Sequence, residues 1–455
     1  MAPVSNQSAG EIASGGAATD TQAEGGLSAR LELLLACAAG LLIANLYYAQ
    51  PLAGLISEAL GMTPSSAGLL FSLPVAGYGV GILIIVPLAD LVENRRIVLV
   101  AVALEVLCLG VIAQIPRPVP FLAVAFLSGI MAAAVQVIVP YVSYLARPAQ
   151  RGGAIGDVVA GLMLGIMLAW PASSFAAHLW GWHSIFYIAT VLQAGLFVLL
   201  WFALPSRKPA AGPSYGGLVL SMGRIFVSTP LLRRRAFYHA FMFGAFSVFW
   251  TAVPLWLRGP PFDMTQAGIG CVALAGVAGA VAPPIAGRLA DRGFSQSGTV
   301  VAMASGIVAF VLSDFAHDSS WLGVGLIVVA AVVLDFAVSA NLVFGQRAIY
   351  GLAPEQRSRV NALYFATFFA GGAISSALSG WCYARFGWAG VSVLGIALPI
   401  VGLLYLATES PKRPAEMHVC QGPLRDNARL VNNAFVVRGS ANRGDQAPAA
   451  DGRDR

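Results

Sequence analysis

Charged residues are scarce in this sequence. Asp, Glu, Lys and Arg make up only 11% of its 455 residues, whereas an average soluble domain has about 25%. Hydrophobic residues make up 58%, and they occur in blocks separated by polar, Gly-rich or Pro-rich stretches. Each block is close to the length of about 20 residues that a helix needs to cross a lipid bilayer. The scarcity of charge therefore indicates a membrane protein, with the lipid bilayer as its surroundings.

Several functional signals are also missing. The sequence has no Gly-x-x-x-x-Gly-Lys loop and no His-Glu-x-x-His pair, which argues against an ATP-driven pump within one chain and against a metalloprotease. Its five cysteines lie far apart and have no disulfide or metal spacing. The net charge of +6 follows from membrane topology and does not indicate nucleic-acid binding. We expect a protein that is not an enzyme and has no cofactor or metal.

The apolar blocks lack the alternation of outer-membrane strands, and backbone polar groups in lipid must be satisfied within a helix or a closed barrel. The sequence therefore predicts an all-α membrane protein. The twelve predicted transmembrane helices cover residues 33–57, 67–89, 97–115, 119–146, 153–177, 183–204, 235–257, 266–288, 298–314, 321–345, 358–380 and 388–407.

Charge distribution predicts the orientation of the chain. Fifteen Arg and Lys residues fall in loops on one side of the predicted helices, against three on the other side, Arg117, Arg258 and Arg385. The positive-inside rule then places both termini in the cytoplasm. The polar ends, residues 1–30 and 408–455, are predicted to be disordered cytoplasmic tails because they cannot bury enough apolar surface.

The chain contains an internal repeat. A shift of 206 residues aligns Pro148-Ala149-Gln150-Arg151 with Pro354-Glu355-Gln356-Arg357, and Gly181-Trp182 with Gly387-Trp388. Several transporter folds are built from two related halves. We therefore expect six-helix bundles over residues 31–204 and 235–407, joined by a cytoplasmic linker loop over residues 205–234.

The repeat and the Leu-x-Asp signals after the second and eighth helices resemble the major facilitator superfamily. Within it, "NLYYAQPL", "GRLADRG", "APEQRSRVNALY" and "GWHSIFYI" are similar to bacterial efflux-type members of the drug:proton antiporter kind. The resemblance implies two pseudo-symmetric six-helix bundles around a central pathway. It departs from the antiporter pattern in the fifth helix, which has Gly161, Gly165 and Ala169 on one face but lacks the Gly-Pro step and has Trp170 where relatives often have Arg.

The resemblance also implies a cytoplasmic gate. Its acidic residues would latch the two halves together by pairing with Arg or with a helix N-terminus, which favours a carboxylate. Both copies of the motif are incomplete, because Leu91 replaces the usual Arg and no basic pair follows in "FSQSG". A solvated loop acid that only supports topology is the alternative for each copy. The gate candidates are Asp90, Arg95, Arg96, Asp291, Arg292 and Arg357.

Two acidic residues fall deep inside predicted helices, where a charge costs about 2.5–3.5 kcal/mol on insertion scales. Asp335 forms a polar stripe with Ser339 in the tenth helix, which by resemblance lines the central pathway. Glu105 is equally deep in the third helix, which by resemblance is peripheral. Both are candidates for proton coupling, and a buried carboxyl that is only hydrogen-bonded is the alternative for each.

Polar and aromatic residues near the midplane are candidates for a substrate cavity. In the first helix, Asn45 and Tyr48 share one face, and Tyr47 and Gln50 form a second such pair. Adjacent residues are about 100° apart on a helix, so both pairs cannot face the cavity squarely, and we prefer Asn45 and Tyr48. The remaining candidates, for which ordinary helix packing is the alternative, are Gln50, Gln136, Trp170, Trp250, Asn361 and Tyr364.

Together these features predict a secondary active transporter in a bacterial inner membrane. It would export a small organic solute by alternating access, coupled to protons, and would function as a monomer. A proton-coupled uptake symporter is the near alternative. A membrane sensor or scaffold that does not transport is an alternative from another class.

Overall fold

A computed structural model describes residues 27–147, 150–206, 214–352 and 356–409, and every regular element within these ranges is a helix. The predicted tails lie almost entirely outside these ranges. Residues 27–30 are an exception, because the first helix already begins at Ala29, with the hydroxyl of Ser28 accepting a hydrogen bond from Leu31 N at its N-terminus.

The N-terminal half, defined here as α1 to α8, contains the first six predicted crossings. Its elements are α1 (Ala29–Ala44), α2 (Ala53–Ala59), the 3₁₀ helix η1 (Pro64–Ser66), α3 (Leu69–Ala89), α4 (Asn94–Ile112), α5 (Pro118–Ala132), α6 (Val135–Leu145), α7 (Arg151–Trp180) and α8 (His183–Ala203). Within this half α1 packs on α7, α3 on α5, and α4 on α8.

The C-terminal half, defined as α10 to α15, contains the other six. Its elements are α10 (Pro230–Arg258), α11 (Gln266–Ala273), the 3₁₀ helix η2 (Leu274–Val281), α12 (Ala282–Asp291), α13 (Ser295–Asp314), α14 (Trp321–Tyr350) and α15 (Arg357–Ala407). Here α14 is the central element, because α10, α12, α13 and η2 all pack on it.

The segment expected to be a linker loop, residues 205–234, contains a helix. α9 (Tyr215–Ser228) is capped by Ser214, whose hydroxyl accepts from Gly217 N. α10 then begins at Pro230, since proline is favourable in the first turn of a helix. The helix therefore begins five residues before the predicted start at residue 235. The three consecutive arginines that start at Arg233 belong to α10.

Three predicted helices are broken. The first, residues 33–57, leaves the α-helical form after Ala44 and resumes at Ala53; Pro51, which lacks a backbone N–H, lies in the break. The eighth, residues 266–288, contains η2, followed by Pro283 and Pro284, which cannot donate to the carbonyls of the preceding turn. The fourth, residues 119–146, is likewise divided into α5 and α6.

Among the described residues, nine helices are long and apolar enough to cross a membrane. One of them, α15, has 51 residues, more than twice the length of one crossing, and a non-helical Gly387 (φ 62°) divides it where the eleventh and twelfth helices were predicted to meet. The broken α1–α2 segment and α4, which carries Arg95, Arg96 and Glu105, account for the two other predicted crossings.

The Gly-Trp repeat has a structural counterpart. Gly181 ends α7 with φ 83°, and Gly387, at the equivalent position in the second half, has φ 62°. This left-handed backbone conformation favours glycine. In each half it turns the chain from the fifth helix into the sixth.

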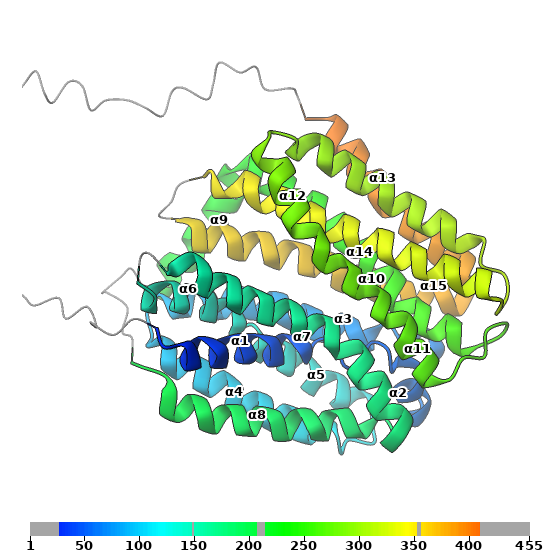
Figure 1. Cartoon of the computed structure of the whole chain (residues 1–455), viewed down its shortest axis with the longest axis horizontal. Coiled ribbons are helices and arrows are strands. Elements are labelled where there is room, and N and C mark those ends of the chain that lie inside the picture. The colour runs from blue at the N-terminus through cyan, green and yellow to red at the C-terminus, as the bar shows by residue number, and fades with distance from the viewer. Residues whose placement is uncertain (1–26, 148–149, 207–213, 353–355, 410–455) are drawn as a thin grey trace, which may run out of the picture. The chain divides into compact units, whose positions relative to one another are not determined.

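The two halves meet at one end of the bundle. α7 packs on α11, and α2 packs on α10, and Figure 1 shows α2 and α11 at this same end. We call it the outer end, and the opposite end, where α3 and α12 finish at Asp90 and Asp291, the inner end. The prediction from charge is that the inner end faces the cytoplasm.

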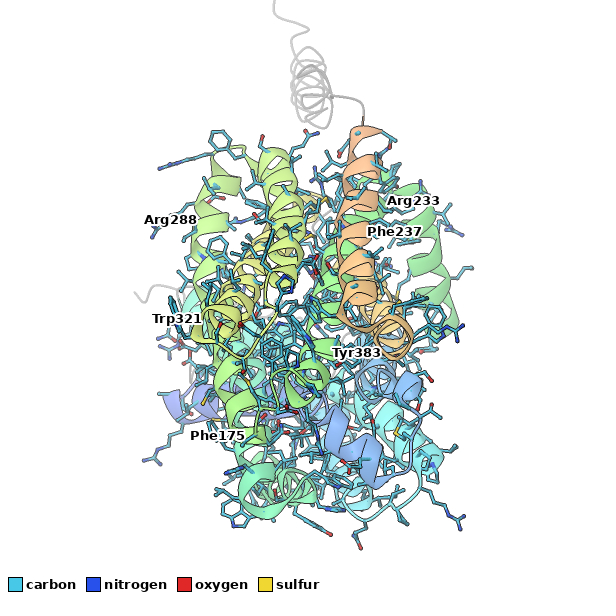
Figure 2. All side chains as sticks on the ribbon, turned by 90° about the vertical axis from the view of Figure 1, so that its right-hand side faces the viewer. Phe175, Arg233, Phe237, Arg288, Trp321 and Tyr383 are labelled. Atoms are coloured by element: carbon cyan, nitrogen blue, oxygen red, sulfur yellow. The ribbon has the colours of Figure 1, made fainter. Side chains whose placement is uncertain are left out.

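The outward surface of the bundle carries large apolar side chains. Trp321 is 86% exposed at the edge of the bundle, and Phe175 and Phe237 are partly exposed (Figure 2). Exposed apolar surface of this extent on a soluble protein would be unusual. On a membrane protein it is the surface that contacts lipid.

Candidate functional site

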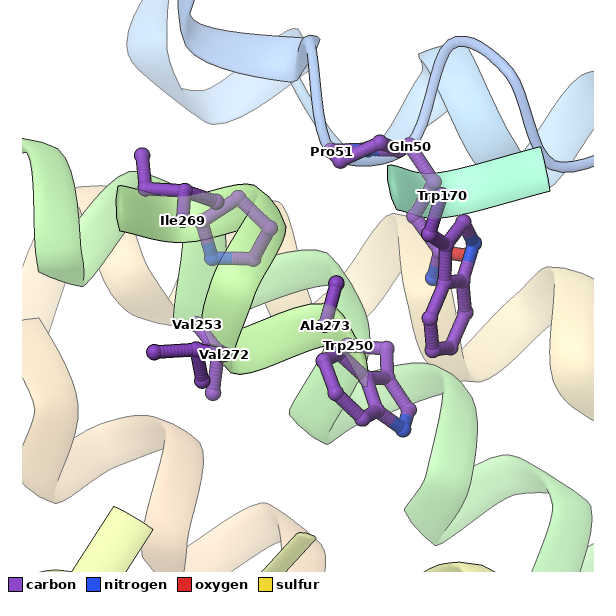
Figure 3. Close-up of a pocket in the computed structure, with 9 residues that line it drawn as sticks. Gln50, Pro51, Trp170, Trp250, Val253, Ile269, Val272 and Ala273 are labelled. Carbon is purple, nitrogen blue, oxygen red and sulfur yellow. The ribbon is translucent and has the colours of Figure 1, made fainter. Parts of the chain in front are cut away.

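A small pocket lies where the two halves meet. It is lined by Gln50, Pro51, Trp170, Trp250, Val253, Pro254, Ile269, Val272 and Ala273, and Figure 3 shows Gln50 and Trp170 facing the residues of α10 and α11 across it. The break in the first helix positions Gln50, because the chain there follows tight turns instead of an α-helix. The pocket therefore has walls from both halves.

Trp250 connects this pocket to a buried acid. Its Nε1 donates a hydrogen bond to Asp335 Oδ1 at 2.9 Å, and Asp335 is only 4% exposed. Glycines in η2 make room for this pair: a side chain at Gly276 would come within 2.8 Å of Asp335 Oδ2, and one at Gly279 within 3.2 Å of Ser339 Oγ. The polar stripe predicted in the tenth helix thus faces a glycine-lined element.

Aromatic rings cross the interface between the halves. The ring centroids of Trp170, from α7, and Trp250, from α10, are 4.2 Å apart, and Phe246 stacks on Trp170 at 5.9 Å. Tyr47 lies edge-on to Trp170 at 6.1 Å. A movement of one half against the other must therefore slide or separate these rings.

Two polar groups at the pocket have no hydrogen-bond partner among the described residues. They are the side-chain amide of Gln50 and the indole nitrogen of Trp170, and both are buried. The pocket volume is about 10 Å³, at the lower limit for one water molecule. Buried polar atoms without a partner are costly, so these two groups are suited to bind a polar atom of a ligand once the pocket widens.

Polar contacts close the outer end. Arg258 Nη2 lies 2.8 Å from Glu58 Oε2, an ion pair between the halves. Gln266 Nε2 donates to Pro51 O at 3.0 Å, and Ser376 Oγ donates to Gly68 O at 3.0 Å. A closed end next to a small central pocket is the arrangement expected of a transporter that exposes its site to one side of the membrane at a time.

Comparison with known proteins identifies the family. The model of the Major Facilitator Superfamily matches residues 35–331. This chain belongs to the Major Facilitator Superfamily. It is similar to the uncharacterized transporter YgaY of Escherichia coli O157:H7, with 34% identity covering 83% of this chain and 95% of that protein. It is also similar to the probable transporter SCO4007 of Streptomyces coelicolor, with 34% identity covering 86% and 89%.

Solved structures support the fold. The crystal structure of the nucleoside transporter NupG is similar with a TM-score of 0.62 and 16% identity, covering 84% of this chain and 98% of that one. The family match and the relatives YgaY and SCO4007 show that the chain is a multi-pass membrane transporter and not an enzyme. Its all-α fold with two related halves agrees with the resemblance seen in the sequence.

The first-helix residues of this superfamily member are arranged differently from the preferred prediction. Gln50 and Tyr47 face the interface, whereas Asn45 and Tyr48 lie beside Glu105 in the N-terminal half. In this structure Asn45 and Tyr48 lie away from the residues that line the pocket, and the preference for them at the substrate cavity stays a prediction. It assumed a continuous helix, and the break after Ala44 changes which side chains point inward.

The remaining cavity candidates extend from the pocket toward the inner end. Gln136 Nε2 donates to the hydroxyl of Tyr78 at 3.0 Å, and the Tyr78 ring meets Phe369 of the other half at 4.6 Å. Tyr364 stacks on His239 at 5.8 Å. Asn361 accepts a long hydrogen bond of 3.4 Å from the Tyr350 hydroxyl, and Asn361 is therefore separated from the Trp250 pair.

His239 is a polar residue that the sequence analysis missed. It is buried in α10, and its Nδ1 lies 3.2 Å from Asn341 Nδ2 of α14. A signal was available, since an ionisable residue inside an apolar helix is a functional candidate by default.

Three of the gate candidates, Arg95, Arg96 and Asp291, make contacts within their own halves. Arg347 of α14 lies 3.4 Å from Asp291, Arg96 lies 2.9 Å from Glu93, and Arg95 Nη2 donates to Trp201 O at 2.6 Å. Arg292 and Arg357 are exposed, and Arg357 lies near Tyr350. Asp90 is exposed at the end of α3. A latch between the halves formed by these residues stays a prediction for another conformation.

Proposed function

We propose that this transporter exports a small organic solute across a bacterial inner membrane by alternating access, and that export is coupled to proton entry through Asp335. Both termini lie in the cytoplasm, and one chain is sufficient. The observation that carries the proposal is the hydrogen bond from Trp250 to Asp335, because Trp250 also forms the wall of the pocket and contacts Trp170 of the other half.

A change in the charge of Asp335 would alter this contact. Hydrogen bonds to an ionised carboxylate are roughly twice as strong as those between neutral groups. An ionised Asp335 therefore holds the Trp250 indole firmly, and a protonated Asp335 releases it. Because the rings of Trp250 and Trp170 are in contact, the release lets the two halves change their relative position.

The closed outer end supports this cycle. Arg258–Glu58 and the hydrogen bonds of Gln266 and Ser376 hold the halves together there, so the solute would enter from the inner end. Its polar atoms would then find Gln50 and Trp170. Rocking of the halves would open the outer end and release the solute, after which a proton from outside would reach Asp335.

The test uses the full chain in proteoliposomes with a pH-sensitive dye inside. Drugs, sugars, nucleosides and amino acids are first screened by thermal shift, and each stabilising compound is then added under an imposed pH gradient. Antiport predicts that the compound moves against the proton flow and dissipates the gradient. Asp335→Asn should bind the compound but lose the proton flux, whereas Asp314→Asn, a carboxyl bound by Ser392 at 2.7 Å, should retain both.

Each alternative predicts a different result. Movement of compound and protons in the same direction would mean uptake by symport and would overturn export. Binding without flux of any compound would indicate a sensor or scaffold. Normal proton coupling in Asp335→Asn would remove Asp335 from the mechanism.

A further inference from the structure

A second buried carboxyl lies outside the pocket, in the N-terminal half. Glu105 of α4 is fully buried, and its Oε1 accepts a hydrogen bond from Ser128 Oγ of α5 at 2.7 Å. Its Oε2 has no hydrogen-bond partner among the described residues. The carboxyl therefore has one oxygen that is satisfied and one that is available.

Asn45 lies beside this carboxyl, at the point where the first helix breaks. Asn45 is 7% exposed and lies close enough to Glu105 to interact with it, but neither atom of its amide reaches hydrogen-bond geometry with a described residue. Asn45 and Glu105 are therefore adjacent, and each has buried polar atoms without a full hydrogen bond. Buried polar atoms are rarely left without a partner in native proteins, so the arrangement points to a bound species that both groups share.

The surroundings of Glu105 contain no basic partner on the helices that pack closely on α4. α5 has no ionisable residue, and α8 has only His183 and Tyr187. The side chains that interact with the carboxyl are Ser128 and Asn45, and the Tyr48 hydroxyl and the Cys108 thiol also lie near it. None of the four carries a positive charge. After Arg96, α4 itself has no Lys, Arg or His. An ionised carboxylate buried here needs a compensating cation.

The internal repeat relates this cluster to the pair in the other half. A shift of 206 residues carries Asn45 to within one residue of Trp250, and Ser128 to within one residue of Asp335. In both halves a buried carboxyl therefore joins equivalent segments of the first and fourth helices of the repeat. In the C-terminal half the carboxyl, Asp335, belongs to the fourth helix itself, whereas in the N-terminal half it is Glu105 of the third helix.

We propose that Glu105, Asn45 and Ser128 form a second cation site, which takes one small monovalent cation, a proton or Na⁺. The oxygens of a carboxylate, an amide and a hydroxyl are the ligands that hard cations prefer. A protonated Glu105 would donate a hydrogen bond to Asn45 Oδ1. Binding at this site is independent of Asp335, whereas its use in transport, as a second ion per cycle, depends on the proposed function.

The experiment measures thermal unfolding of the purified full chain in detergent, in two series. The first varies NaCl at constant pH and constant ionic strength, with choline chloride as the balancing salt. The second varies pH without Na⁺. A ligand that binds only the folded state raises the melting temperature as its concentration rises. We expect one of the two cations to stabilise the wild type, which also identifies the occupant.

Glu105→Gln should remove this dependence on the cation, because a neutral amide needs no compensating charge. Asp314→Asn should keep it, and Asp314 is a close match because a serine hydroxyl donates to its carboxyl at the same distance of 2.7 Å. If Glu105→Gln responds to Na⁺ and to pH as the wild type does, the site does not exist. A second result would also contradict the site. In it, the melting temperature of the wild type does not change with Na⁺, and Glu105→Gln and Asp314→Asn show the same change with pH.

A second variant keeps the proposal testable if Glu105→Gln does not fold. Ser128→Ala retains the carboxyl but removes its hydrogen bond, and hydrogen bonds to a charged group are stronger than those between neutral groups. We expect the cation concentration for half-maximal stabilisation to shift by about tenfold or more. An unchanged midpoint would contradict the site. Because these measurements need no transported solute, they can succeed when the proposed export activity fails, and the reverse also holds.

Discussion

Trp250 has two roles at the residue scale, since it forms a wall of the pocket and donates to Asp335. Trp250→Phe keeps an aromatic ring and removes the donor. An acceptor that loses its partner inside a protein costs about 1–3 kcal/mol, more for a charged group. We therefore expect a loss of that size in the free energy of unfolding, measured by denaturation in detergent.

The control is Trp256→Phe. Trp256 lies in the same helix and stacks on Trp388 at 4.0 Å, so the same amount of ring is removed from a buried aromatic contact. The comparison should also include pH, because only the loss in Trp250→Phe depends on the charge of Asp335. Equal losses in both variants at every pH would show that Trp250 acts only through packing.

The sequence alone indicated Asp335 and Trp250 as candidate site residues. It did not indicate that Gln50, and not Asn45, lines the pocket of this structure. A carboxyl in an apolar helix is costly wherever that helix lies, so Asp335 could be recognised without knowledge of the fold. The side that Asn45 faces depends on where the helix breaks, and the break itself depends on packing against the rest of the bundle. The sequence therefore predicted which residues are candidates, but not the direction in which a side chain next to a helix break points.

At the element scale, α1 and α7 pack at unusually close range. A side chain on Gly40 would come within 2.6 Å of Gly161 O, and side chains on Gly161 and Gly165 would collide with the backbone at Ala36 and Gly40. Small residues at four-residue spacing allow this approach in membranes. The face predicted from Gly161, Gly165 and Ala169 is therefore a helix contact within the N-terminal half.

Gly165→Ala tests this contact. The added methyl group must displace backbone, and overpacking of this kind costs about 1–3 kcal/mol. Gly156→Ala is the matched control in the same helix, because a side chain there would meet nothing within 4 Å. We expect Gly165→Ala to lower the melting temperature and Gly156→Ala to raise it slightly, since alanine is favoured over glycine in a helix by about 1 kcal/mol. The same change in both variants would refute the contact.

Helix positions could be predicted more easily than helix continuity. Runs of apolar residues locate the crossings because lipid requires them, and the turn at Gly387 followed from its match with Gly181. The unwound segment after Ala44 and the 3₁₀ turn η2 form where glycine and proline permit them and where neighbouring helices accept the resulting shape. Those neighbours come from distant parts of the sequence, so single-segment patterns do not specify the breaks.

At the scale of the whole molecule, both halves are held at the outer end by contacts that are individually weak. The Arg258–Glu58 pair is partly exposed, and such pairs contribute about 0–1 kcal/mol. Weak contacts suit a transporter, because they must form and break in every cycle. Several small interactions together keep the outer end closed. A single covalent bond across the halves should hold it closed more strongly than all of them combined.

This leads to a crosslinking prediction. In a background without the five native cysteines, Glu58→Cys with Arg258→Cys places two thiols across the halves, and a bifunctional thiol reagent of suitable length can bridge them. Bridging should stop flux of a transported compound, and cleavage of a reducible bridge should restore it. Asp314→Cys with Ser392→Cys is the matched control, because that pair lies 2.7 Å apart within the C-terminal half and its bridge leaves the halves free to move. If flux continues through the bridged Glu58–Arg258 pair, the outer end does not need to open during transport, and alternating access about this interface is wrong.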